Sequence, residues 1–131
     1  MEQKTIPSMD RWLREAKQDS SAAKIGMYLV HNGVVRQSAR AKVRFGEETA
    51  PDVQKMLFSY DEAKVQKAIK EAYELEGIYY VRAWLNSGEL SVGEDIMYVL
   101  LGGDIRPHVT AALDFLVGKL KNECVTEKEI Y

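Results

Sequence analysis

Residues 78–103 read IYYVRAWLNSGELSVGEDIMYVLLGG, and this stretch decides the fold class. It opens with a run over 78–85 that is rich in Tyr, Val and Trp and predicts a β-strand. Residues 86–89, NSGE, are a turn signal, and a second turn is expected at Gly93. Residues 96–101 are almost continuously apolar, which is typical of a central strand covered on both faces. The stretch therefore predicts strands joined by tight turns, as in a largely antiparallel sheet.

Three helices are expected around these strands. Ser8 precedes apolar residues at helical spacing, so we expect a short helix over 8–17 with Ser8 as its N-cap. Asp61 caps a second helix, whose apolar stripe leads to a terminating glycine at Gly77. The third and longest helix runs over about 106–122, with a proline in its first turn.

The remaining segments complete the expected order of elements. Residues 24–36 read as a strand that turns or bulges at Asn32-Gly33, because Asn-Gly favours positive φ. The other segments are a polar, mobile loop over 37–52 with a short strand at 41–45, a strand over 53–59 and a short charged tail over 123–131. The order helix, strands, helix, strands, helix indicates an α+β fold in which about three helices pack on a largely antiparallel sheet.

Length and composition narrow the class of protein. The 131 residues are 46% hydrophobic and 29% charged, so we expect one globular domain over residues 1–131. There is no apolar run of about 18 residues that would predict a membrane span. Residues 1–7 lack the apolar core of a signal peptide, which favours a cytoplasmic location. Cys124 is the only cysteine, so an internal disulfide and a cysteine-cluster metal site are excluded.

Charge is unevenly distributed along the chain. The net charge is −2, which argues against a general nucleic-acid-binding protein. Between Asp19 and Glu47, however, there is no acidic residue and the local charge is +5, which leaves −7 for the remainder. The basic residues of this segment are Lys24, Arg36, Arg40, Lys42 and Arg44. The segment is either a binding site for a small anion or a solvated edge whose arginines prevent aggregation.

No strong catalytic motif is present. The chain has no phosphate-binding loop, no G-x-S-x-G and no H-E-x-x-H. His31 and His108 are far apart, so we expect no metal site; His31 is predicted to be a satisfied core residue and His108 to be exposed. Lys121 borders the apolar stripe of the last helix. A lysine held against apolar surface is usable as a nucleophile, whereas one whose stem alone is buried keeps its charge in water.

Three segments resemble the large, catalytic subunit of molybdopterin synthase, the MoaE family. Asn32-Gly33-Val34-Val35-Arg36 is similar to the family's G-x-V-R pattern. Residues 88–94, GELSVGE, resemble its stretch before a hydrophobic strand. In the third segment, residues 104–128, Arg106 falls where the family has a His-Arg pair, Lys121 matches the lysine near the end of the last helix, and Lys128 matches a lysine seven residues later. The order of elements over roughly 8–130 also fits the family.

The resemblance implies a fold, a reaction and a site. The fold is the family's α/β hammerhead, which forms a homodimer. The enzyme makes the dithiolene of molybdopterin by transferring sulfur to a cyclic pyranopterin monophosphate, and it binds no cofactor itself. The sulfur comes from the Gly-Gly thiocarboxylate of a small ubiquitin-like subunit. By resemblance, Lys121 is the central catalytic lysine and Lys128 assists it. Arg36 and Arg106 bind the substrate anion, and Gly33 and Arg40 belong to the wall of this pocket.

The chain also departs from the family pattern. At four places where the family has mostly polar or aromatic pocket residues, this chain has other residues. These are Ile105, Phe58-Ser59, Leu85-Asn86 and Val125-Thr126-Glu127. The prediction of enzymatic activity is therefore left open. The alternative is a divergent, non-catalytic homologue that binds a pterin, another phosphate ester or a ubiquitin-like partner. A third possibility is a purely structural dimer in which the basic segment pairs with an acidic neighbour.

Overall fold

A computed structural model describes residues 5–131 and confirms the predicted α+β class. The helical elements are α1 (Met9–Ala16), η1 (Ala22–Lys24), α2 (Arg40–Phe45), α3 (Glu62–Tyr73), α4 (Arg106–Lys119) and the π-helical turn η2 (Leu120–Cys124). The strands are β1 (Met27–Val34), β2 (Lys55–Tyr60), β3 (Ile78–Leu85), β4 (Gly88–Ser91), β5 (Asp95–Gly103) and β6 (Val125–Ile130).

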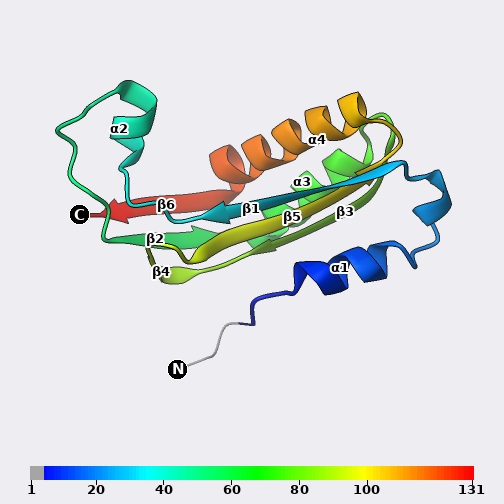
Figure 1. The fold of residues 1–131 in the computed structure, drawn as a ribbon, viewed down its shortest axis with the longest axis horizontal. Helices are drawn as coiled ribbons and strands as arrows, with labels where there is room; N and C mark the ends of the chain where they lie inside the picture. Colours follow the sequence, from blue (N-terminus) through cyan, green and yellow to red (C-terminus); the bar gives the residue numbers. More distant parts are fainter. Residues whose placement is uncertain (1–4) are drawn as a thin grey trace.

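The described strands form two antiparallel sheets of three strands each (Figure 1). The first has the order β1-β5-β3 and the second the order β4-β2-β6. The apolar β5 is the central strand of the first sheet, and most of its residues are buried. The prediction of a covered central strand is thus confirmed. The tight turns expected after β3 and before β5 lead into and out of the short strand β4.

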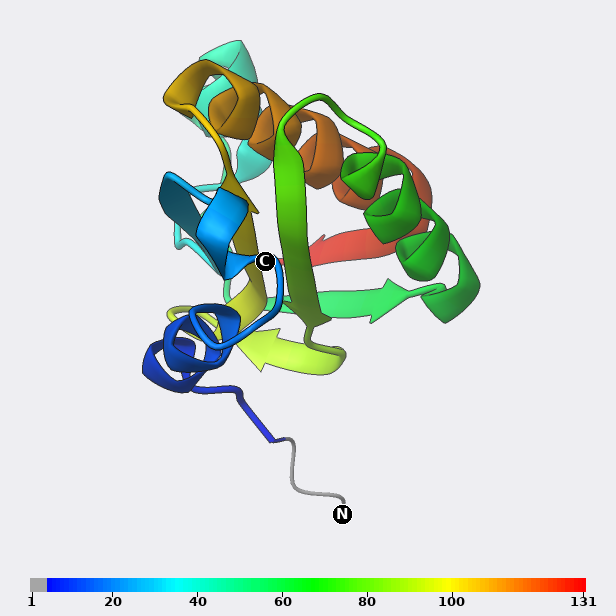
Figure 2. The same cartoon turned by 90° about the vertical axis from the view of Figure 1, so that its right-hand side faces the viewer.

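Helices cover both faces of the first sheet (Figure 2). α3 and α4 lie side by side on one face, where the main core forms around Val99, Leu101 and Leu116. α1 lies on the opposite face, where Trp12 and Ala16 pack on Leu100. This burial on both faces leaves one end of the sheets uncovered by α3 and α4 (Figure 1). α2 lies at that end, near the C-terminus of the chain (Figure 1).

The helix caps are as predicted, and the helix ends differ slightly. The Ser8 hydroxyl accepts a hydrogen bond from the Arg11 backbone N–H, and the Asp61 carboxylate accepts one from that of Lys64. Gly77 takes the left-handed conformation with φ 76°, but α3 itself ends at Tyr73. The expected long last helix is α4 followed by η2, whose wider turn ends at Cys124.

The expectation at Asn32-Gly33 is half right. The pairing of β1 with β5 shifts register between Gly33 and Val34, so the strand bulges there. Gly33 has no positive φ, however, and β1 continues through it instead of turning. The hydrogen bonds to the long strand β5 hold this segment extended and override the local preference of Asn-Gly for a turn.

The short strand predicted at 41–45 is wrong, because these residues form helix α2. Arg, Ala and Lys are good helix formers, and Gly46 ends the helix in the left-handed conformation with φ 68°. The buried side chain of Ala39 anchors the helix at its start. The loop over 37–52 therefore contains a regular element that carries Arg40 and Arg44 on one face.

The charged tail predicted over 123–131 is also wrong, because 125–130 form strand β6. β6 pairs with β2 along its whole length, from Tyr60↔Val125 to Lys55↔Ile130. A strand that alternates charged and partly buried residues is stabilised by its partner more than by its own composition. The local sequence TEKE consequently gives no strong strand signal.

No helix within residues 5–131 has the length and apolar character needed to cross a membrane.

Candidate anion-binding site

A cavity of about 370 Å³ lies where α2, η2 and β6 meet. Five basic residues line it, namely Arg36, Arg40, Arg44, Lys121 and Lys128. Two carboxylates, Glu127 and Glu129, lie among them, so the lining has a formal charge of +3. Val34, Met56 and Ile96 supply an apolar part of the wall. The cavity therefore suits a ligand that combines an anionic group with an apolar or planar body.

Arg36 reaches the cavity because the chain is fixed immediately before it. Val35 is buried, its N–H donates to the Glu94 carbonyl at 3.0 Å, and its own carbonyl accepts from the Gly93 N–H at 2.8 Å. Arg36 itself donates from Nε to the Ser38 carbonyl at 3.0 Å, and its other guanidinium N–H groups have no partner within residues 5–131, so they can bind an anion.

Arg40 and Arg44 come from α2, and Glu129 of β6 holds that helix in place. The backbone N–H of Arg40 donates to both carboxylate oxygens of Glu129, at 3.3 and 3.0 Å. The Tyr131 hydroxyl donates to the same carboxylate at 3.0 Å, and this hydrogen bond raises the pKa of Tyr131. Since Arg40 and Arg44 are four residues apart, they lie on the same face of α2. The pocket wall is thus tied to the C-terminal strand.

Lys121 and Lys128 come from two consecutive elements, η2 and β6. Lys121 lies in η2, and the chain then enters β6, where Lys128 pairs with Leu57. Both lysines line the cavity. Single π-helical turns of this kind often occur at functional sites. The two lysines that the resemblance assigns to catalysis therefore lie in the same pocket as Arg36 and Arg40.

His31 lies next to this pocket. Burial lowers the pKa of the His31 imidazole, and the nearby positive charge of Lys121 lowers it further. Its Nε2 atom is buried and has no hydrogen-bond partner within residues 5–131. The expectation of a satisfied core histidine is therefore wrong, because no described residue offers Nε2 a hydrogen-bond partner.

Gly33 shapes the wall without lining it. A Cβ at this position would lie 3.2 Å from the Met97 Cγ and 3.8 Å from the His31 Nε2. A side chain here would crowd Met97 and the His31 ring. The next residue, Val34, lines the cavity after the bulge.

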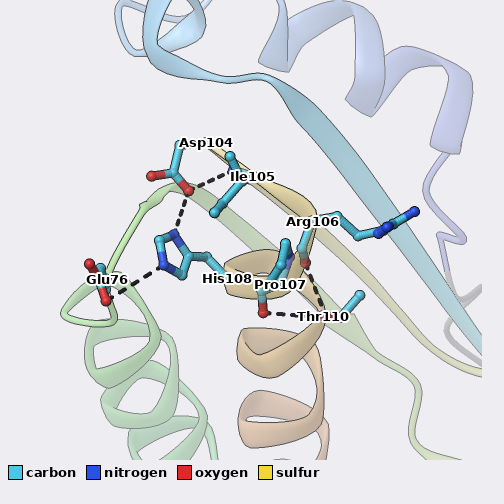
Figure 3. Close-up of polar contacts among 7 residues, drawn as sticks. All are labelled: Glu76, Asp104, Ile105, Arg106, Pro107, His108 and Thr110. Carbon is cyan, nitrogen blue, oxygen red and sulfur yellow. Dashed lines mark hydrogen bonds and ion pairs between the residues drawn. The ribbon is translucent and has the colours of Figure 1, made fainter.

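Arg106 does not join the other predicted site residues within one chain. It starts α4, whereas Lys121 follows the end of that helix, about 20 Å away along the axis. Figure 3 shows the Arg106 side chain pointing away from the polar cluster at this end of α4. The basic groups that meet in one cavity are therefore Arg36, Arg40, Arg44, Lys121 and Lys128.

The cluster beside Arg106 centres on His108. Its Nδ1 lies 2.7 Å from the Asp104 carboxylate, and its Nε2 lies 3.5 Å from that of Glu76 (Figure 3). The hydrogen bond to Asp104 raises the pKa of His108, and the same bond lowers the pKa of Asp104. The prediction that His108 is merely exposed is thus wrong, because two carboxylates bind its ring. This cluster joins α4 to the loop after α3.

Sequence reasoning missed three residues of the pocket. Arg44 was counted only as part of the basic segment, because 41–45 read as a strand and its spacing from Arg40 carried no meaning. Glu127 and Glu129 lie in the segment over 123–131 that the sequence predicts to be a short charged tail. The sequence carries no signal for either, because 126–129 are all polar and the alternation of partly buried and exposed residues over 125–130 appears only in the structure.

A second cavity, of about 360 Å³, lies between α3 and η2. It is lined by lysines and glutamates and by Cys124, whose thiol pKa is raised by burial. Within residues 5–131, no group of three or more His, Cys, Asp or Glu side chains is arranged to hold a metal ion.

Comparison with known proteins agrees with this fold. Residues 7–123 match the MoaE protein family. No curated protein sequence matches the chain. Molybdopterin synthase from Staphylococcus aureus is similar in structure, with a TM-score of 0.71 at 16% identity, covering 95% of this chain and 86% of that one.

Two further structures are similar. The molybdopterin biosynthesis MoaE protein from Burkholderia ambifaria MC40-6 has a TM-score of 0.69 at 19% identity, covering 94% of this chain and 82% of that one. A complex of subunits 1 and 2 of molybdopterin-converting factor from Helicobacter pylori 26695 has a TM-score of 0.62 at 18% identity, covering 95% and 84%. Because the family match spans most of the sequence, this chain belongs to the MoaE family.

Proposed function

We propose that this chain is the large subunit of a molybdopterin synthase and acts in molybdenum cofactor biosynthesis. In this proposal it transfers sulfur from the thiocarboxylated Gly-Gly end of a small ubiquitin-like subunit to cyclic pyranopterin monophosphate. Membership of the MoaE family supports the reaction class. The observation that carries the proposal is the meeting of Arg36, Arg40, Lys121 and Lys128 in one cavity, although they come from three separate segments.

The chemistry of the cavity suits this reaction. Arginine guanidiniums bind a phosphate through paired hydrogen bonds, and Arg36, Arg40 and Arg44 are available for this. A lysine close to a thiocarboxylate carbonyl either forms a covalent adduct or stabilises the negative charge that develops on the carbonyl oxygen. We assign this part to Lys121 and a supporting part to Lys128. Both lysines lie in the pocket with the three arginines.

The test is conversion of the pterin by purified protein. The chain is mixed with a thiocarboxylated small subunit and cyclic pyranopterin monophosphate, and molybdopterin is measured. Lys121→Ala is expected to lower the rate by about a hundredfold or more. Lys119→Ala is the matched control, because Lys119 pairs with Glu123 at 2.9 Å and does not line this cavity. Unchanged conversion by Lys121→Ala would disprove the assigned mechanism.

A second candidate function is binding of the pterin phosphate or of the small subunit without sulfur transfer. Two observations favour it. Glu127 and Glu129 place carboxylates beside Lys128, and Arg106 is remote from the pocket within one chain. Calorimetry with the pterin phosphate, run beside the conversion assay, separates the two candidates. Binding without turnover by the wild-type protein supports the second.

The assembly that we propose has two copies of the chain, each bound to one small subunit, in the cytoplasm. The Helicobacter pylori complex of subunits 1 and 2 is a precedent for a small-subunit partner in a protein of this fold. Size-exclusion chromatography with light scattering tests the dimer, and co-elution with a small subunit tests the complex.

A further inference from the structure

Glu127 carries a buried acceptor atom in a cavity whose other charged groups are mostly donors. Its Oε1 atom is inaccessible to solvent and has no hydrogen-bond partner within the described part of the chain. Glu127 also makes no ion pair with any residue of 5–131, although Lys121 and Lys128 line the same cavity. A buried carboxylate oxygen without a donor is costly, and native proteins rarely keep one without a use.

The position of Glu127 places this acceptor in the apolar part of the pocket. Glu127 pairs with Phe58 of β2, and Glu129, two residues on, pairs with Met56. Glu127 and Glu129 therefore lie on one face of β6. Phe58 and Met56 are both buried, and Met56 and Ile96 line the cavity together with Glu127. A planar ring that enters between these apolar side chains would present its edge to Glu127.

Glu129 provides an internal comparison. It lines the same cavity from the same face of the same strand. Its carboxylate oxygens are occupied, because they accept from the Arg40 N–H at 3.0 and 3.3 Å and from the Tyr131 hydroxyl at 3.0 Å. Of these two carboxylates, that of Glu129 is thus engaged in holding the protein together, whereas that of Glu127 has no ion pair and its Oε1 no hydrogen-bond partner within residues 5–131, and a ligand would reach this Oε1 only once the side chain turns toward the cavity.

We propose that Glu127 is a specificity-determining residue that accepts hydrogen bonds from the ring N–H groups of the bound heterocycle. This inference rests on the proposed function, which supplies a pterin phosphate as the ligand. The 2-amino-4-oxopyrimidine edge of a pterin carries adjacent N–H donors, which a carboxylate recognises well. The arginines and lysines then bind the phosphate, and Glu127 binds the opposite end of the same molecule. The cavity thereby selects a phosphate ester joined to a hydrogen-bond-donating ring over other phosphates.

The test compares two ligands that differ in ring donors. Binding of cyclic pyranopterin monophosphate and of phenyl phosphate, which has no N–H group, is measured by calorimetry for the wild type and for Glu127→Gln. The substitution is nearly isosteric, but it replaces one acceptor by a donor and removes a negative charge. We expect the affinity for the pterin phosphate to fall about tenfold or more. The affinity for phenyl phosphate is expected to stay equal or to rise, because a repulsive charge is lost.

Glu129→Gln is the matched control, because it removes the same charge from the same cavity. We expect Glu129→Gln to change the affinities for the two ligands in the same direction, since the Glu129 oxygens already accept hydrogen bonds from the protein. Thermal melting of both variants checks that they are folded. If Glu127→Gln changes the two affinities in parallel, or leaves pterin binding unchanged, the specificity role is wrong. If the wild type binds no pterin phosphate at all, the proposed function fails as well, and this result is distinct from the first.

Discussion

The side-chain carboxylate of Glu129 accepts two hydrogen bonds from the backbone N–H of Arg40, a residue 89 positions earlier in the chain. Through this contact, strand β6 determines where α2 lies. α2 carries Arg40 and Arg44, so the position of two pocket cations depends on one carboxylate of a distant strand. A helix of six residues has little stability of its own, so a contact of this kind matters for its order.

Loss of the Glu129 carboxylate is expected to loosen α2. Hydrogen bonds to a charged group at an exposed site contribute about 1 kcal/mol, so Glu129→Ala should raise amide hydrogen exchange over 40–45 about fivefold. Exchange measured by mass spectrometry checks this. Tyr131→Phe is the control, because it keeps both bonds between Arg40 and Glu129 and removes only the hydroxyl. Equal exchange in Glu129→Ala and wild type would show that the loop is held by other contacts.

Arg44 is expected to contribute to anion affinity. It lines the cavity on the same face of α2 as Arg40, whereas Lys42 does not line the cavity. Arg44→Ala should weaken binding of the pterin phosphate by about threefold to tenfold at low salt, and the difference should shrink at high salt. Lys42→Ala makes the same change of charge on α2 and should have a smaller effect. Calorimetry at two salt concentrations measures both, and equal losses would assign the effect to net charge.

The stability of the fold should depend on pH through His108. The hydrogen bond to Asp104 raises the pKa of His108 above 6.5. The contribution of His108 to the free energy of unfolding is therefore full below pH 6.5 and is lost as the pH rises through the raised pKa. The pKa of Asp104 is lowered below 3.8, chiefly by the same bond, so its contribution is present above pH 3.8 and is lost as pH falls through the lowered value.

The wild type should therefore exceed His108→Ala in stability most clearly between pH 3.8 and 6.5, with the difference declining at higher pH. Urea unfolding of both proteins across this range measures the difference. The depressed pKa of His31 affects both proteins alike, so it cancels. A difference that is constant up to pH 9 would contradict a charged interaction at His108.

Two glycines are expected to respond to alanine in opposite directions. A Cβ at Gly103 would lie 2.6 Å from both the Gly77 carbonyl oxygen and the Val109 Cγ2, so Gly103→Ala should destabilise the fold by about 1–3 kcal/mol. Gly118 lies inside α4 with no atom within 4 Å of its Cβ position. Gly118→Ala should therefore stabilise by about 0.5–1 kcal/mol. Urea unfolding measures both, and destabilisation by Gly118→Ala would indicate a contact that the alanine methyl disturbs.

Local sequence patterns were sufficient to predict the elements whose own residues carry a clear helix or strand signal. The continuous apolar run of β5, the Ser8 and Asp61 caps and the stripe of α4 predicted those elements with small errors at their ends. α2 and β6 were missed because both depend on distant partners. The strand β6 needs β2, and α2 needs the carboxylate of Glu129.

The sequence likewise predicted only part of the candidate site. Arg36, Lys121 and Lys128 were found through a resemblance to a family pattern, and the structure places them in one cavity. Spacing along the chain could not show that Arg106 lies at the far end of α4, nor that Arg44 faces the cavity. The orphaned oxygen of Glu127 is a property of packing in three dimensions, so no sequence pattern predicts it.

The pairing of β2 with β6 also bears on how the protein is made. β2 precedes β6 by more than 60 residues, so a growing chain on the ribosome exposes β2 as an unpaired edge for several seconds at ordinary elongation rates. The ligand pocket is assembled only after translation has passed residue 128. Nascent chains stalled earlier should hence be prone to aggregate and unable to bind pterin, which makes ligand binding a reporter of synthesis past β6.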